Sequence, residues 1–171
     1  MDITAKRSSA VFLAALLLQF AHFIEHIAQF YQHAVLNFPI KESHGILFFA
    51  DLEWNHFIFN LLYFLLLAYP CFKMRYFEKK SGVGLKNQFF RILFLSGFYL
   101  QGYHVLEHAA RIGQTLQSSC APCPGLLGWY IDGIYLHFYI NLITLALPLA
   151  AFVGLKTYRN LYPQKTAVSI V

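Results

Sequence analysis

Four apolar stretches dominate this chain, and each is long enough to cross a lipid bilayer as an α-helix. They cover residues 11–35, 45–69, 89–112 and 126–155, whereas a membrane-spanning helix needs about 20 residues. Helices are favoured because lipid offers no hydrogen-bond partner to an unpaired backbone. Only 12% of the residues are charged, which is about half the fraction usual in a soluble domain. We therefore predict an all-α integral membrane protein that forms one domain over residues 1–171.

The distribution of basic residues predicts how the chain is oriented. The net charge is +5, but the basic residues lie between and beyond the apolar stretches instead of forming one basic face, so no nucleic-acid partner is expected. They gather in the N-terminal segment, in the connection after the second stretch and in the C-terminal tail. The other two connections hold Lys41 and Arg111. Because cytoplasmic loops are rich in Lys and Arg, both termini are predicted to be cytoplasmic, as in a bacterial inner-membrane protein.

The chain also contains an internal repeat. Residues 18–32 (LQFAHFIEHIAQFYQ) and 100–114 (LQGYHVLEHAARIGQ) share seven of fifteen positions. Residues 51–62 (DLEWNHFIFNLL) and 132–143 (DGIYLHFYINLI) share five of twelve. The two offsets, 82 and 81 residues, agree, and most of the shared residues are polar although the chain is mainly apolar. A chance match is therefore a poor explanation.

We interpret the chain as two tandem two-helix repeats, over about residues 11–70 and 89–155. Each repeat crosses the membrane an even number of times, so both repeats have the same orientation. The predicted architecture is an antiparallel four-transmembrane-helix bundle with a pseudo-two-fold axis along the membrane normal.

Histidines and glutamates recur in these apolar stretches at helical spacing. Residues at i, i+3 and i+4 share one face of a helix, and both the first and the third stretch contain the pattern H-x-x-E-H. The second and fourth stretches each add one histidine. With the predicted topology, all six histidines fall in the outer half of the membrane and can converge. The predicted metal ligands are His22, Glu25, His26, His56, His104, Glu107, His108 and His137.

This pattern predicts a metal site, because ionisable groups inside a membrane are costly and usually functional. Neutral imidazole binds copper, iron and zinc, and three imidazoles can hold an ion while leaving one position open. Each repeat supplies three, so two ions per chain are expected. Glu25 and Glu107 are expected to bind or bridge the ions or to act as catalytic bases. A polar network that only holds the helices together is the structural alternative.

Further polar residues are expected to orient the histidines. Asp51 and Asp132 lie five residues before a histidine and off its helical face, so they either accept from a histidine of a neighbouring helix or cap their own helix. In the second repeat, Ile134 occupies the position that corresponds to Glu53, which makes the two halves chemically unequal. The residues assigned to this supporting role are Asp51, Glu53, Asn60, Asp132 and Asn141.

Cys120 and Cys123 form a C-x-x-C motif in the outer connection after the third stretch. A disulfide is the preferred interpretation because the outer side is oxidising. A redox pair and an entry site for copper are the alternatives.

Two resemblances follow from these residues. The sequences HFIEH and HVLEH are similar to the H-x-x-E-H motif of inverzincin metallopeptidases, which implies histidines that bind zinc and a glutamate that acts as base. The arrangement of three histidines per ion from paired helices of a bundle resembles type-3 binuclear copper proteins such as tyrosinase. The glutamates within the histidine pairs favour iron or zinc instead.

The first functional hypothesis is therefore a membrane oxidoreductase with a two-metal site near the outer face and a lipid-soluble small substrate. A hydrolase with zinc-activated water is a related possibility. The alternatives are a transporter of metal ions or protons and a cofactor-binding accessory subunit of a larger membrane complex. Membrane lipid is the expected surrounding in every case.

Overall fold

The computed structural model describes residues 3–46, 53–75, 85–118, 120 and 122–162. These residues form four long helices, and two short 3₁₀-helices follow α1 and α4. The described residues contain no strand, so the all-helical prediction is confirmed. The elements are α1 (Ile3–Ala34), η1 (Ile40–Glu42), α2 (Glu53–Lys73), α3 (Leu85–Ser118), α4 (Gly133–Gly154) and η3 (Thr157–Leu161).

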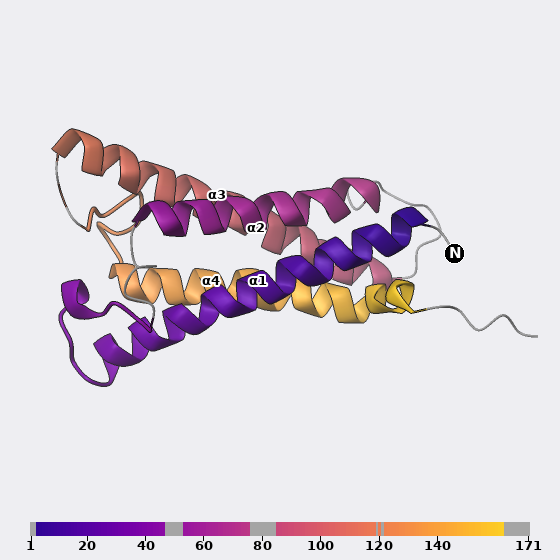
Figure 1. Ribbon diagram of the computed structural model, residues 1–171, viewed down its shortest axis with the longest axis horizontal. Helices are drawn as coiled ribbons and strands as arrows, with labels where there is room; N and C mark the ends of the chain where they lie inside the picture. Colours follow the sequence, from indigo (N-terminus) through magenta and orange to yellow (C-terminus); the bar gives the residue numbers. More distant parts are fainter. Residues whose placement is uncertain (1–2, 47–52, 76–84, 119, 121, 163–171) are drawn as a thin grey trace, which may run out of the picture.

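The four long helices lie side by side and alternate in direction (Figure 1). Helix α1 packs against α2 and α4, and α3 packs against the same two helices. The helices therefore follow one another around the bundle in chain order. The connections after α1 and after α3 lie at one end, which we call the loop end. The N-terminus lies at the opposite end (Figure 1).

Three of these helices, α1, α2 and α4, are long and apolar enough to cross a membrane. Helix α3 has 34 residues but falls outside this group, although the sequence analysis counted it as a fourth span. The reason is its composition, because it carries polar and charged side chains such as Gln101, Glu107 and Arg111. Gln101 and Glu107 are fully buried within the bundle, so polar side chains in the middle of α3 face its neighbouring helices.

The helices α2 and α4 begin later than the apolar stretches of the sequence suggest. Gly45, the expected start of the second stretch, has a φ of +77° and lies outside any helix. Helix α4 begins at Gly133 rather than near residue 126, because the Asp132 side chain accepts a hydrogen bond from the backbone N–H of Ile134 (2.8 Å) and caps the helix. Such a cap satisfies a backbone donor that otherwise has no partner.

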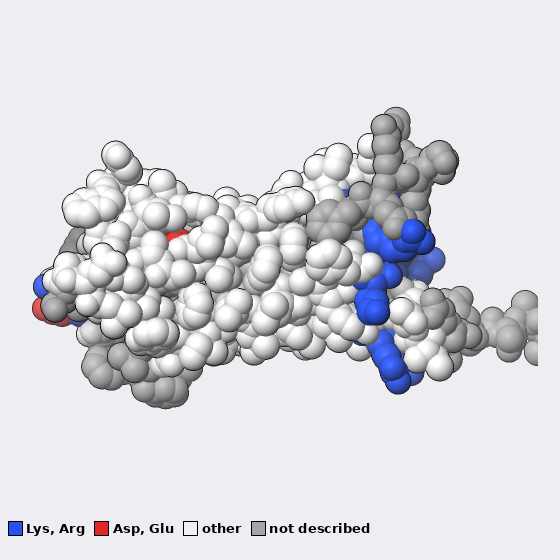
Figure 2. Space-filling view, turned by 90° about the horizontal axis from the view of Figure 1, so that it is seen from above, with Lys and Arg blue, Asp and Glu red and all other residues white. Residues whose placement is uncertain are grey.

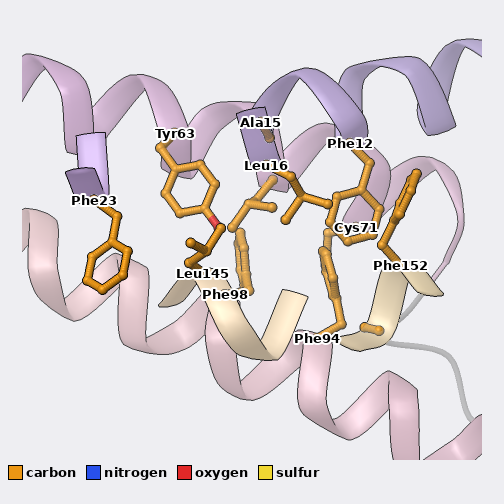
Figure 3. Close-up of a cluster of buried hydrophobic side chains, with 12 residues drawn as sticks. Phe12, Ala15, Leu16, Phe23, Tyr63, Cys71, Phe94, Phe98, Leu145 and Phe152 are labelled. Atoms are coloured by element: carbon orange, nitrogen blue, oxygen red, sulfur yellow. The ribbon is translucent and has the colours of Figure 1, made fainter. Parts of the chain in front are cut away.

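An apolar core lies mostly on the side of the histidines away from the loop end, and Phe23, which follows His22 in the chain, extends it toward them (Figure 3). The ring of Phe12, which is 0% exposed, meets those of Phe94 and Phe152 edge-on, with centroids 5.1 Å apart in both pairs. Phe98 stacks on Phe64 with a centroid distance of 4.8 Å. Residues from all four helices contribute to this core, so it joins the whole bundle.

A layer of hydrogen bonds lies between this core and the histidines. Gln19 donates to Oδ1 of Asn141 (2.8 Å), and Gln101 donates to Oδ1 of Asn60 (2.9 Å). The two asparagines in turn donate to the backbone carbonyls of His56 (2.9 Å) and His137 (2.8 Å). Buried amides need such partners. The layer therefore fixes the register of the four helices one turn away from the histidine side chains.

Basic residues cluster at the end of the bundle opposite the loop end. Figure 2 shows lysine and arginine side chains gathered there, while the middle of this face has almost no charge. The exposed basic residues at the helix ends and in η3 are Lys6, Arg7, Lys73, Arg75, Lys156 and Arg159. We call this surface the basic end.

Candidate metal centre

The six histidines singled out by the repeat form two buried groups of three. His22, His26 and His56 form the first triad, and His104, His108 and His137 form the second. Within each triad the three possible ligand nitrogens lie within 4.8 Å of one another. Each triad takes two histidines from one helix and one from the next, because residues at i and i+4 share a helix face. Both arrangements can hold a transition-metal ion.

In the first triad, the Nε2 atoms of His22 and His26 face each other at 3.1 Å. His26 donates from Nδ1 to the side-chain oxygen of Gln29 (2.9 Å), so its Nε2 carries the free lone pair. With metal–nitrogen bonds of about 2.0–2.1 Å, a separation of 3.1 Å corresponds to an angle at the ion of about 100°. The pair is therefore spaced to chelate one ion. The ring of Phe59 stacks on His22.

The second triad repeats this geometry. The Nε2 atoms of His104 and His108 are also 3.1 Å apart. His108 places Nδ1 against the carboxylate of Glu53, and His137 donates from Nδ1 to the backbone carbonyl of Gly133 (2.7 Å). Outer partners of this kind fix which ring nitrogen is free to bind a metal. Partners outside the triad therefore set the tautomers of His108 and His137.

The two triads touch each other. The rings of His56 and His108 stack with centroids 5.7 Å apart, and those of His26 and His137 stack with centroids 6.0 Å apart. Each contact joins a histidine of one triad to a histidine of the other. The six imidazoles consequently form one continuous cluster that can hold two ions close together.

The glutamates of the H-x-x-E-H patterns lie elsewhere than the sequence analysis expected. Neither Glu25 nor Glu107 belongs to either triad. Glu107 accepts at Oε1 from the backbone N–H of Leu126 (3.0 Å) and at Oε2 from the hydroxyl of Tyr103 (3.0 Å). The carboxylate of Glu25 lies directly against Gly45. The connection after α3 folds back over Glu107 and supplies the N–H donors of Leu126 and Leu127, which draw this carboxylate away from the imidazoles.

The same connections are held by a matching pair of glutamines. Gln32 and the backbone of Gly45 exchange two hydrogen bonds of 3.0 and 2.8 Å. Gln114 and Gly125 exchange two of 2.8 Å each. Both glycines have positive φ, +77° and +73°, a conformation that glycine adopts most easily. Each connection is thus clamped to the helix that precedes it.

Replacing Gly125 by alanine is expected to lower the melting temperature by several degrees. A left-handed backbone costs a residue with a side chain about 1–2 kcal/mol, and the added methyl group would collide with Oε1 of Glu107. Gly113→Ala is the matched control, because nothing lies within 4 Å of its Cβ position and alanine favours a helix. Circular dichroism melts in detergent measure both variants. Equal melting temperatures would contradict the clamp.

Glu53 and Arg111 form an ion pair next to the second triad. Nε of Arg111 lies 3.3 Å from Oε2 of Glu53 and donates to the backbone carbonyl of Cys123 (2.9 Å). Nη1 of the same guanidinium lies 3.2 Å from Nε2 and 3.4 Å from Nδ1 of His137. A positive charge therefore rests against the ring of a candidate ligand.

The other residues that were predicted to orient the histidines lie at different places around the triads. Asn60 and Asn141 belong to the hydrogen-bonded layer beneath the triads. Asp132 caps α4 and also lies 3.3 Å from Nε2 of His33, a histidine of neighbouring α1 outside both triads. Asp51 lies outside the described residues. The sulfur atoms of Cys120 and Cys123 are within bonding distance, in agreement with the disulfide interpretation.

A cavity of about 710 Å³ lies between the triads and the connections of the loop end. One side is formed by four of the six histidines, with Glu53 and Arg111 beside them. The other side includes Lys41, Cys123 and Trp129 from the connections. The cavity therefore gives a small molecule room next to the cluster. The histidines that line it are His26, His56, His108 and His137.

Sequence reasoning did not find every residue in contact with the triads. Gln29 lies on the polar stripe of α1, but its bond to His26 depends on the rotamers of both side chains. Arg111 has no identical counterpart in the first repeat, where position 29 holds glutamine. The backbone carbonyl of Gly133, which accepts from His137, could not be predicted from a pattern of side chains. The signal available for Arg111 was its i+3 spacing from His108.

Comparisons of the chain with protein-family models, with curated proteins and with solved structures find no match.

Proposed function

We propose that this chain is an integral membrane metalloprotein that binds two transition-metal ions, one in each histidine triad, and uses them as an oxidoreductase. The observation that carries the proposal is the pair of buried triads, each with three nitrogens within 4.8 Å, joined into one cluster by stacked rings. Six buried imidazoles from four helices exceed what a polar contact between helices requires. A lone polar pair of that kind contributes only about 0.6–2 kcal/mol.

Copper is the ion that the donor set favours. Imidazole suits copper, zinc and iron, whereas non-haem iron sites commonly add a carboxylate to two histidines. Iron or zinc was predicted from Glu25 and Glu107, and neither of them belongs to a triad. Two adjacent copper ions, when bound, supply two one-electron acceptors. Zinc fits the same nitrogens without redox chemistry and would favour the hydrolase alternative.

We further propose that all four long helices span the membrane, with the triads in its outer half and both termini in the cytoplasm. The middle of helix α3 buries Gln101, His104, Glu107 and His108 within the bundle and exposes apolar side chains such as Ile92, Tyr99 and Leu106, which suits a span shielded by its neighbours. The basic end then faces the cytoplasm, as cytoplasmic segments are rich in Lys and Arg. Hydrogen bonds between Gln19 and Asn141 and between Gln101 and Asn60 match under the repeat offsets, which supports two repeats related by a pseudo-two-fold axis.

The apolar core disfavours the transport alternative. A path for ions from the triads to the basic end needs polar groups along its length. Phe12, Phe94 and Phe152 instead fill the bundle on that side of the triads (Figure 3). Substrates are expected to reach the cluster through the cavity of the loop end or from the surrounding lipid, and other membrane subunits are the proposed protein partners.

The test is elemental analysis of the protein extracted from copper-supplemented membranes in mild detergent without chelator. We expect about two copper ions per chain, together with an optical or electron paramagnetic resonance signal. His33→Ala is the matched control: His33 is the α1 histidine paired with Asp132, so this variant should keep both ions. Less than one ion of copper, iron or zinc per chain would reject the proposal.

A further inference from the structure

The two triads differ in one respect that bears on what they bind. Arg111 and Glu53 lie beside the second triad. The positions that correspond to them in the other repeat hold Gln29 and Ile134, which are both neutral. His26 therefore has an amide as its partner where His108 has a carboxylate. Among the described residues, a guanidinium lies next to a ligand nitrogen in the second triad alone.

Arg111 is held in place along one edge. Its Nε donates to the carbonyl of Cys123 (2.9 Å) and lies 3.3 Å from the Glu53 carboxylate. The Nη1 side rests against His137, and the residue lines the cavity. A guanidinium has five N–H donors and no acceptor, so anchoring through Nε leaves donors for a bound molecule. A fixed cation of this kind is suited to an anionic group.

A metal ion on the second triad would place a second positive charge beside the Arg111 guanidinium. Three imidazoles leave one coordination position open, but Nη1 of Arg111 donates to Nε2 of His137 (3.2 Å), the nitrogen whose lone pair the ion needs. An ion that takes this nitrogen displaces Nη1 and then lies next to the guanidinium. Two positive charges so close repel each other strongly in a poorly solvated site. A negatively charged group that binds the ion and accepts from the guanidinium would relieve that repulsion. The cavity of about 710 Å³ has room for a small organic molecule there.

We infer that the second site binds the carboxylate group of a small organic acid between its metal ion and Arg111. Carboxylate is the preferred class because one of its oxygens can bind the ion while the other accepts from the guanidinium. The inference rests on the proposed function, since it requires an ion on the second triad. The first triad, with Gln29 at the corresponding position, has no such site, so the two ions have different roles.

The test uses protein loaded with Cu²⁺ and titrated with acetate, or with acetamide as its neutral analogue, while the visible absorption band of the metal is followed. We expect acetate to shift the band and acetamide to bind at least about tenfold more weakly. Arg111→Gln, which copies the residue of the first repeat, is expected to weaken acetate binding by about 10- to 100-fold, as for a lost hydrogen bond to a charged group. Its copper content should stay at the wild-type value.

Two control variants separate the effect of the Arg111 fork from the effect of positive charge in the cavity. Arg111→Lys keeps the charge without the fork and should bind acetate with intermediate affinity. Lys41→Gln changes an exposed cation in the lining of the same cavity and should have less than about a threefold effect, because exposed ion pairs are weak.

The inference is overturned if Arg111→Gln binds acetate like the wild type, if acetamide binds as tightly as acetate, or if Arg111→Gln loses its copper. A wild-type protein that takes up no copper, iron or zinc gives a different result. It rejects the proposed metal centre itself, and the carboxylate site with it.

Discussion

The protein with His22→Ala is expected to hold one metal ion per chain where the wild type holds two. His22 belongs only to the first triad, and its Nε2 faces that of His26 at 3.1 Å. Removing one of three ligands leaves two imidazoles, so the affinity of that site should fall by more than the 10- to 100-fold typical of an outer partner. The second triad keeps all its ligands and its ion.

His104→Ala is the corresponding change in the second triad and should also leave one ion, this time in the first. The two variants differ in a way that identifies the sites, because only the ion of the second triad lies beside Arg111. Metal content and the acetate response of the remaining ion measure the difference. If either single variant loses both ions, the six histidines hold one shared cluster, and the assignment of one ion to each repeat is wrong.

Replacing Phe12 by alanine should destabilise the bundle severely without changing the metal site. Phe12 is 0% exposed and contacts the rings of Phe94 and Phe152. Truncating a buried phenylalanine costs about 3–5 kcal/mol because it leaves a cavity. For a chain of this length, that loss lowers the melting temperature by roughly 6–20 °C. Thermal melts in detergent measure the change.

Phe20→Ala provides the control on the same helix. Phe20 is 55% exposed, so the variant should melt close to the wild type. Phe12 and His22 are ten residues apart on α1, about 15 Å along the helix axis. The protein with Phe12→Ala should therefore keep two ions at low temperature. Loss of metal at a temperature where the helices remain folded would show that the core also shapes the site.

Much of the fold could be predicted from the sequence, because long apolar stretches leave the backbone few alternatives to helices. The ends of the helices were harder to predict. Gly45 begins the second apolar stretch, yet its backbone lies outside any helix and is hydrogen-bonded to Gln32, thirteen residues earlier. Asp132 was expected either to support a histidine or to cap α4, and it caps α4 while also facing His33. Such choices depend on contacts between segments that a local pattern does not contain.

The members of the two triads could be predicted from the sequence, since i and i+4 spacing places two histidines on one helix face and the second helix of each repeat supplies the third. The position of the carboxylates could not. Glu107 lies one position before His108, yet the N–H groups of Leu126 and Leu127 bind it at the loop end. A helical pattern specifies the direction of a side chain only to within part of a turn, and the nearest partner decides the rest.

The sequence by itself determined which residues can act as ligands, because residue type and helical period are local properties of the chain. Only the tertiary structure decided that Glu53 of α2 and Arg111 of α3 meet beside the second triad. Glu53 contacts His108, 55 residues away along the chain, and Arg111 contacts His137, 26 residues away. The physical reason is that charges from different helices interact only at the distances that packing sets. The difference between the two triads depends on that packing.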